Sequence, residues 1–318
     1  MTFPRMASFK THAAFTRHLN NLQLTLPCAE LVENGPESPL AQTIHVHDLK
    51  IGNRFCILPM EGWDGTADGK PSELTRRRWQ NFGRSGAKLI WGGEAVAVRH
   101  DGRANPNQMV INVENLPEIG SLRAELVATH EAEFSTAADL VIGLQLTHAG
   151  RFAKPDSHDR MQPRTAQRNS ILDTRCGITD DSALFSDDEI ATLIEDFITA
   201  AVLAEQAGFQ FVDIKHCHGY LGHELLSGVD RPGKFGGSFE NRTRFLREIV
   251  AGIRSRTSSL EIGVRVSIFD FLPFTQGPDG VGIVEETGDP SLIFGCDSTC
   301  VGIDLHEPKK FFSLLQSL

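Results

Sequence analysis

One stretch of the sequence gathers side chains that can move protons and donate hydrogen bonds. "VDIKHCHGYLGHELLS" spans residues 212–227 and contains Lys215, His218 and Tyr220, the only tyrosine in the 318 residues. A phenol with a reference pKa near 10 stays protonated at neutral pH and can act as a general acid. An ammonium group can donate to an oxyanion, although it is a point charge on a flexible stem. The stretch is therefore typical of a site for proton transfer.

The elements that must position these residues follow a regular alternation. Apolar runs alternate with amphipathic stretches, and Ser186 with Glu189 forms a capping box at the start of the clearest helix, which ends before Gly208. Apolar strands that are each followed by such a helix indicate a parallel sheet covered by helices. We expect strands at 54–60, 87–93, 139–146, 209–215 and 261–269, and helices at 7–21, 72–86, within 115–134, at about 187–207 and at 238–255.

Two observations favour a barrel over an open doubly wound sheet. No expected strand is followed by G-x-G-x-x-G, the nucleotide-binding fingerprint of the open sheet. The polar motifs instead fall at the C-terminal ends of successive strands, where a (β/α)₈ barrel carries its active site. We therefore predict an α/β fold of the (β/α)₈ TIM-barrel class.

The number of strands is too small for a complete barrel. Five strand–helix units precede a polar segment at 273–300, and "IDLHEPKKFFSLLQSL" then predicts one further helix. Because eight strands close a barrel, we expect about five to six units here, with the last strands missing beyond the end of this sequence. Residues 1–43 are expected to be an N-terminal extension, and residues 44–318 a truncated barrel domain.

Composition narrows the class of partner. The net charge of −10 argues against a nucleic-acid surface, which needs clustered Lys and Arg. Six cysteines without C-x-x-C spacing predict reduced thiols in the cytoplasm, and no apolar segment approaches the length that crosses a bilayer. We expect a soluble cytoplasmic protein with a small-molecule substrate and no nucleic-acid or membrane partner. The sequence leaves a homo-oligomer open.

Five separated motifs resemble a known family. They occur in the family's order between residues 44 and 318, and together they resemble the old yellow enzyme family of NADH:flavin oxidoreductases. The resemblance implies FMN held noncovalently at the C-terminal mouth of the barrel. It also implies NADH or NADPH as reductant and an electron-poor alkene or related acceptor as substrate. The motifs are "ILPM", "GLQLTHAGR", "HGYLGHELLS", "RPGKFGGSFENRTRFLREIV" and "GVRVS".

The resemblance assigns six positions to the flavin, namely Pro59, Met60, Glu61, Ala95, Gln145 and Arg265. The Gln145 amide offers one acceptor and two donors, which match the alternating edge of a flavin ring. Arg265 interrupts an apolar strand and needs an anionic partner, either the reduced flavin or a carboxylate on a neighbouring strand. Glu61 departs from the family's threonine or cysteine, so we expect it either to turn away or to lower the flavin's reduction potential.

The same resemblance assigns the acceptor side of the site. Lys215 and His218 match the pair of donors that polarise the acceptor's carbonyl, although the family carries histidine at the first position. Tyr220 matches the proton donor, with a structural buried tyrosine as the alternative, and Arg151 is assigned to the substrate site. Because lysine replaces an imidazole, we expect a substrate preference different from that of the enone reductases.

Two other interpretations remain open at this point. His216, His218 and His223 with Glu224 could ligate zinc in a metal-dependent TIM-barrel hydrolase, although the other strand ends offer no further ligands of that kind. The chain could also be a non-enzymatic remnant, because barrels bind phosphate with loops that follow the last strands. For that reason we expect these 318 residues alone to bind FMN weakly.

Overall fold

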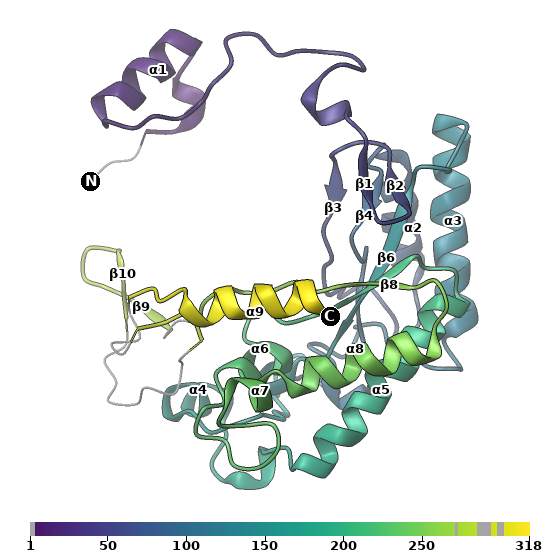
Figure 1. The fold of residues 1–318 in the computed structure, drawn as a ribbon, viewed down its shortest axis with the longest axis vertical. Helices are drawn as coiled ribbons and strands as arrows, with labels where there is room; N and C mark the ends of the chain where they lie inside the picture. The colour runs from purple at the N-terminus through teal and green to yellow at the C-terminus, as the bar shows by residue number, and fades with distance from the viewer. Residues whose placement is uncertain (1–3, 271–272, 285–293, 298–301) are drawn as a thin grey trace.

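A parallel sheet forms the centre of the computed structural model, which describes residues 4–270, 273–284, 294–297 and 302–318 (Figure 1). The strands lie in the order β3-β4-β6-β7-β8, and β5 also pairs with β6. Every pairing within this sheet is parallel. The strands are β3 (Cys56–Ile57), β4 (Leu89–Ile90), β5 (Ala95–Ala97), β6 (Val141–Thr147), β7 (Phe211–Ile214) and β8 (Glu261–Gly263).

Of the strand predicted at 87–93, only Leu89–Ile90 form a strand, β4, and a further strand, β5, follows beyond the predicted end; the two pair with successive parts of β6. The break between β4 and β5 falls at Gly92, whose φ of +78° is rare for residues with a side chain, and a Cβ there would lie 2.8 Å from the Gln145 amide nitrogen. Beyond it, the outward amides of Ala95 and Ala97 donate to the carbonyls of Met60 and Met109, at 3.0 and 2.9 Å. Both ends of β5 are therefore hydrogen-bonded to the backbone of other segments.

The helices that follow the strands pack in pairs on the sheet's outer side (Figure 1). Helix α2 packs against α3, and α5 packs against α8. Ser186 and Glu189 form the predicted capping box at the start of α5, and the buried face of α5 joins the main core. The helices named here are α2 (Glu73–Arg84), α3 (Leu116–Phe134), α5 (Asp187–Gln206) and α8 (Arg244–Arg256).

The single helix predicted at 238–255 was wrong in one detail, since the structure has α7 (Phe239–Arg242) before α8. The break falls at Thr243, whose hydroxyl and amide both donate to the Phe239 carbonyl, at 2.8 and 3.0 Å. A threonine hydroxyl that bonds the preceding turn competes with the backbone ladder. The strand predicted at 261–269 is likewise shorter, because only Glu261–Gly263 pair as β8 and the chain then continues through an isolated bridge between His216 and Val266.

The segments around the sheet are shorter elements. Helix α1 stands apart from the sheet at the end of an extended segment, and it begins at Thr11, whose hydroxyl accepts a bond from the Ala14 amide (Figure 1). Strands β1 and β2 pair antiparallel, as do β9 and β10. These elements are α1 (His12–Asn21), β1 (Ile44–Val46), β2 (Leu49–Ile51), α4 (Ser170–Cys176), α6 (Leu221–Leu226), β9 (Phe274–Gln276), β10 (Gly282–Val284) and α9 (His306–Ser317), with single 3₁₀ turns at Met6–Ser8, Pro39–Ala41, His100–Gly102, Gly150–Phe152 and Asp181–Ala183.

The strands of the described residues do not close into a barrel. Strands β3 and β8 lie at the two edges of the sheet, so the order of strands agrees with an incomplete barrel, and α9 confirms the last predicted helix. Part of the predicted polar segment at 273–300 lies outside the described residues, as does Cys300, while Cys28, Cys56, Cys176 and Cys217 are free thiols. In the part of the chain that is described, no helix combines the length and apolar character of a bilayer span.

Candidate active site

The tip of the sheet is organised by a buried carboxylate that sequence reasoning missed. Asp213 lies beside Gln145 in the register of β6 and β7, and its Oδ2 accepts bonds from Gln145 Nε2 at 2.5 Å and Trp91 Nε1 at 2.8 Å. Its Oδ1 accepts the Arg265 amide at 2.6 Å. Burial raises the pKa of this carboxyl, and the three donors oppose the shift. The sequence does carry one signal that could have pointed to Asp213, namely a charged residue inside the apolar run "FQFVDIK".

Pro59 and Met60 meet two of the other predicted flavin residues. The Met60 carbonyl accepts the Ala95 amide at 3.0 Å, and the Pro59 carbonyl lies 3.5 Å from Arg265 Nη1. Ala95 is buried and neighbours Gln145 in the pairing of β5 with β6. The structure therefore brings Pro59, Met60, Ala95, Gln145 and Arg265 to one end of the sheet, although they lie up to about two hundred positions apart in the sequence.

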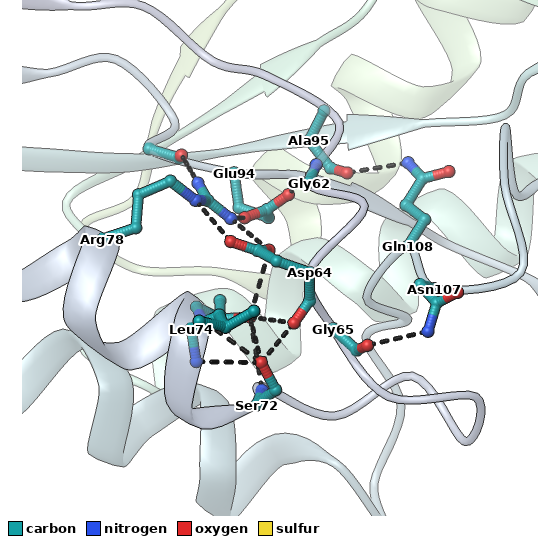
Figure 2. A network of polar contacts seen from close by, with 12 residues as sticks. Gly62, Asp64, Gly65, Ser72, Leu74, Arg78, Glu94, Ala95, Asn107 and Gln108 are labelled. Atoms are coloured by element: carbon teal, nitrogen blue, oxygen red, sulfur yellow. Dashed lines mark hydrogen bonds and ion pairs between the residues drawn. The ribbon is translucent and has the colours of Figure 1, made fainter.

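A second network of polar contacts, which sequence reasoning also missed, holds the loop that follows Met60 (Figure 2). The fully buried Glu94 accepts the Gly62 amide at 2.5 Å, and Arg78 Nη2 donates to both Glu94, at 2.5 Å, and Asp64, at 2.8 Å. A Cβ at position 62 would lie 2.5 Å from Arg78 Nη2 and 2.7 Å from Glu94, so a larger residue there would displace the ends of these side chains. Burial outweighs the attraction of Arg78 and raises the pKa of Glu94 to about 7.

Glu61 and Lys215, the two departures from the family pattern, contact each other. The Lys215 ammonium forms an ion pair with the Glu61 carboxylate and lies 3.7 Å from the centre of the Tyr220 ring. The Lys215 side chain is 2% exposed and that of Glu61 is 20% exposed. Burial, followed by the charge of Glu61 and a hydrogen bond to it, raises the pKa of Tyr220 above its ordinary value. The phenol therefore keeps its proton at neutral pH.

His218 and Cys217 complete the group around Lys215. The His218 backbone is in the left-handed region, with φ of +63°, and its amide donates to Ser267 Oγ at 3.1 Å. Partial desolvation by its surroundings lowers the pKa of the solvent-exposed His218, and the charges of Lys215 and Arg265 lower it further, so the imidazole is neutral at pH 7. Burial raises the pKa of the Cys217 thiol to about 11, which leaves it protonated.

Arg151 lies in a different environment. All three of its guanidinium nitrogens donate within a buried cluster: Nε and Nη2 donate to Glu224, at 3.2 and 2.6 Å, and Nη1 donates to Asp173. Nη2 also donates to Thr165 at 2.8 Å. It also borders, with His218, a cavity of about 310 Å³. The structure thus places Arg151 near the site, with its hydrogen bonds directed to protein partners.

The residues considered for zinc do not converge. His216 Nδ1 faces the Ile214 carbonyl at 3.2 Å, His223 Nδ1 accepts the Gly219 amide at 2.9 Å, and burial lowers both pKa values to about 4. The centre of the His216 ring lies 6.1 Å from the ring centres of both Phe245 and Phe311. Within the described ranges, no three His, Cys, Asp or Glu side chains gather as a metal site. This geometry gives the hydrolase interpretation no support.

Comparison with known proteins supports the predicted barrel fold and the family that the motifs indicate. Its similarity to an NADPH dehydrogenase of Bacillus pumilus is 31% identity over 73% of the chain and 63% of the relative. Its similarity to an NADH:flavin oxidoreductase of Gibberella zeae is 33% identity over 57% of the chain and 45% of the relative. The chain therefore spans about half to two-thirds of the length of these relatives.

The solved structure of an old yellow enzyme from Pichia has the same fold, with a TM-score of 0.60 and 21% identity over 74% of this chain and 61% of that one. The pattern of the NADH:flavin oxidoreductase / NADH oxidase family matches residues 39–288, which is most of the chain. The chain belongs to this family of oxidoreductases, whose cofactor is FMN and whose reductant is NADH or NADPH.

Proposed function

We propose that this chain binds FMN at the end of its sheet and passes hydride from NADH or NADPH, through the flavin, to an electron-poor alkene or related acceptor, with Tyr220 as the proton donor. The observation that carries the proposal is the convergence of Gln145, Arg265, Lys215, His218 and Tyr220, which come from the ends of three neighbouring strands. Bound FMN would supply the hydride-transferring centre.

The donors on the cofactor side fit a flavin ring. Gln145 gives one N–H to Asp213, which leaves its second N–H and its carbonyl for a ligand edge that alternates acceptors and a donor. Among the described residues, the Arg265 guanidinium has no carboxylate within ion-pair distance, and its one hydrogen bond is to the neutral Pro59 carbonyl at 3.5 Å. A partly buried guanidinium that interacts with the Asp213 carboxylate only beyond ion-pair distance favours an anionic ligand. This supports the flavin over a structural salt bridge as its partner.

The donors on the acceptor side fit a carbonyl-bearing substrate. His218 is exposed and neutral, so it carries one N–H that can donate to a carbonyl oxygen. Lys215 has three N–H groups, and its pair with Glu61 leaves others for the same oxygen. Tyr220 holds its proton beside them and can deliver it to carbon as negative charge develops.

The test uses the chain itself. FMN should bind to the chain, and quenching of FMN fluorescence measures this binding. In the absence of oxygen, NADH or NADPH should bleach the yellow complex. A cyclic enone should then restore the colour. Arg265→Met should weaken FMN binding by about tenfold or more, since it removes a desolvated charge–charge contact. Arg256→Met, which alters an exposed ion pair with Glu195, is the matched control. A chain that binds no FMN, or whose reduced complex no alkene reoxidises, would contradict the proposal and favour the non-enzymatic remnant.

A further inference from the structure

Glu61 is fixed in front of Tyr220 by the backbone on both of its sides. The preceding residue, Met60, accepts the Ala95 amide at 3.0 Å. The following residue, Gly62, donates to the buried Glu94 at 2.5 Å; both residues are labelled in Figure 2. The side chain then reaches across to Lys215, 154 positions later in the sequence. Because the backbone is tied on both sides of Glu61 and Lys215 binds its carboxylate, the place of this side chain beside the phenol is part of the fold.

The side chains of Lys215 and Glu61 differ in how far they are exposed to water. Lys215 is almost completely buried, and its ammonium covers the face of the Tyr220 ring at 3.7 Å, while Phe152 lies 6.4 Å from that ring. Glu61, at 20% exposure, reaches solvent more than Lys215 does. The titratable groups that face the phenol are Glu61, Lys215 and Cys217, and Cys217 remains a thiol. Of these, Glu61 combines contact with the phenol and contact with water.

We propose that Glu61 is the proton-exchange partner of Tyr220, and that Lys215 holds its carboxylate in place and compensates its charge. The inference rests on the proposed function. When Tyr220 protonates the substrate, its O–H bond breaks, a C–H bond forms and the electron pair stays on the phenolate oxygen. A proton taken from water through Glu61 then restores the O–H bond. Glu61 is thus a positioning residue that acts through Tyr220.

The single tyrosine of the chain makes the coupling directly measurable, with or without flavin. Ionisation of a phenol changes its ultraviolet absorbance, so a difference titration reports on Tyr220 alone, and Tyr220→Phe gives the baseline. In Glu61→Gln the tyrosinate signal should appear about one pH unit or more below its position in the unchanged chain, because a nearby negative charge is removed. Glu307→Gln is the matched control, since Glu307 is 26% exposed and pairs with the buried Arg242. Coincident curves for Glu61→Gln and the unchanged chain would overturn the proposal.

A second measurement separates proton exchange from a purely structural effect. In the FMN-loaded chain, Glu61→Gln should slow reoxidation by an enone more than reduction by NADPH, and added formate or acetate should restore part of the lost rate. Absence of rescue by small carboxylic acids, with reoxidation slowed no more than reduction, would overturn the exchange role. Failure of the chain to bind FMN would overturn the proposed function, while the tyrosine titration would still decide whether Glu61 controls the phenol.

Discussion

Gln145 Nε2 donates to Asp213 Oδ2 at 2.5 Å, and both side chains are buried at the tip of the sheet. The carboxylate fixes which way the amide faces, because it accepts only from the nitrogen end of the glutamine. The arrangement of donor and acceptor that Gln145 offers to a flavin is therefore set by a residue on the neighbouring strand.

Asp213→Asn should destabilise the fold and loosen this orientation. The new amide keeps one oxygen where the carboxylate had two, so at least one of its three donors loses its acceptor. Leaving a buried donor unsatisfied costs about 1–3 kcal/mol. Urea unfolding measures this loss, with Asp188→Asn, exposed at the start of α5, as the control. An unchanged midpoint would show that Asp213 does not hold the network together.

Glu94 should make stability depend on pH. Its pKa is raised from 4.5 to about 7, so the folded protein keeps a proton that the unfolded chain has already released. Its stabilising contribution is therefore present below pH 4.5 and is lost as pH rises through 7, by up to about 3 kcal/mol. Glu94→Gln should remove the share of this dependence that comes from Glu94, measured as unfolding free energy between pH 5 and 8, while Asp270, whose pKa burial also raises to about 7, keeps its own share. Glu133→Gln, exposed at the end of α3, should retain it.

The buried cluster around Arg151 should be important for stability. Glu224→Gln leaves a guanidinium that is 1% exposed without one of its two carboxylates, and breaking a buried pair costs about 3–5 kcal/mol. Glu195→Gln removes the exposed partner of Arg256 and should cost less than about 1 kcal/mol. Thermal or urea unfolding of the two variants compares them. Similar small effects in both would argue against a structural role for the cluster and would favour a substrate role for Arg151.

Tyr220→Phe should separate the two halves of the proposed reaction. Loss of the general acid should slow reoxidation of the reduced FMN complex by an enone about 10²–10⁴-fold. Reduction by NADPH should change little, because the phenol takes no part in it. Stopped-flow measurement of each half-reaction tests this, with Phe152→Leu as a control for packing beside the ring. Equal rates of reoxidation in both proteins would eliminate Tyr220 as the proton donor.

Features encoded by neighbouring residues were predicted from the sequence. The capping box of Ser186 and Glu189 marks the start of α5, and the order of apolar strands gives the parallel sheet. The pairing of Glu61 with Lys215 could not be predicted, since each residue alone appears as a departure from a motif, and only the fold brings positions 154 apart into contact. The break between β4 and β5 depends on a positive φ at Gly92, which periodicity does not report.

Strand β5 also affects how the protein behaves in a crowded solution. The outward amides of Ala95 and Ala97 are already bound to Met60 and Met109, so the side of β5 that faces away from β6 offers neither donor to a strand from another molecule. The same backbone bonds that shape the candidate site thereby keep this side of β5 from pairing with another chain.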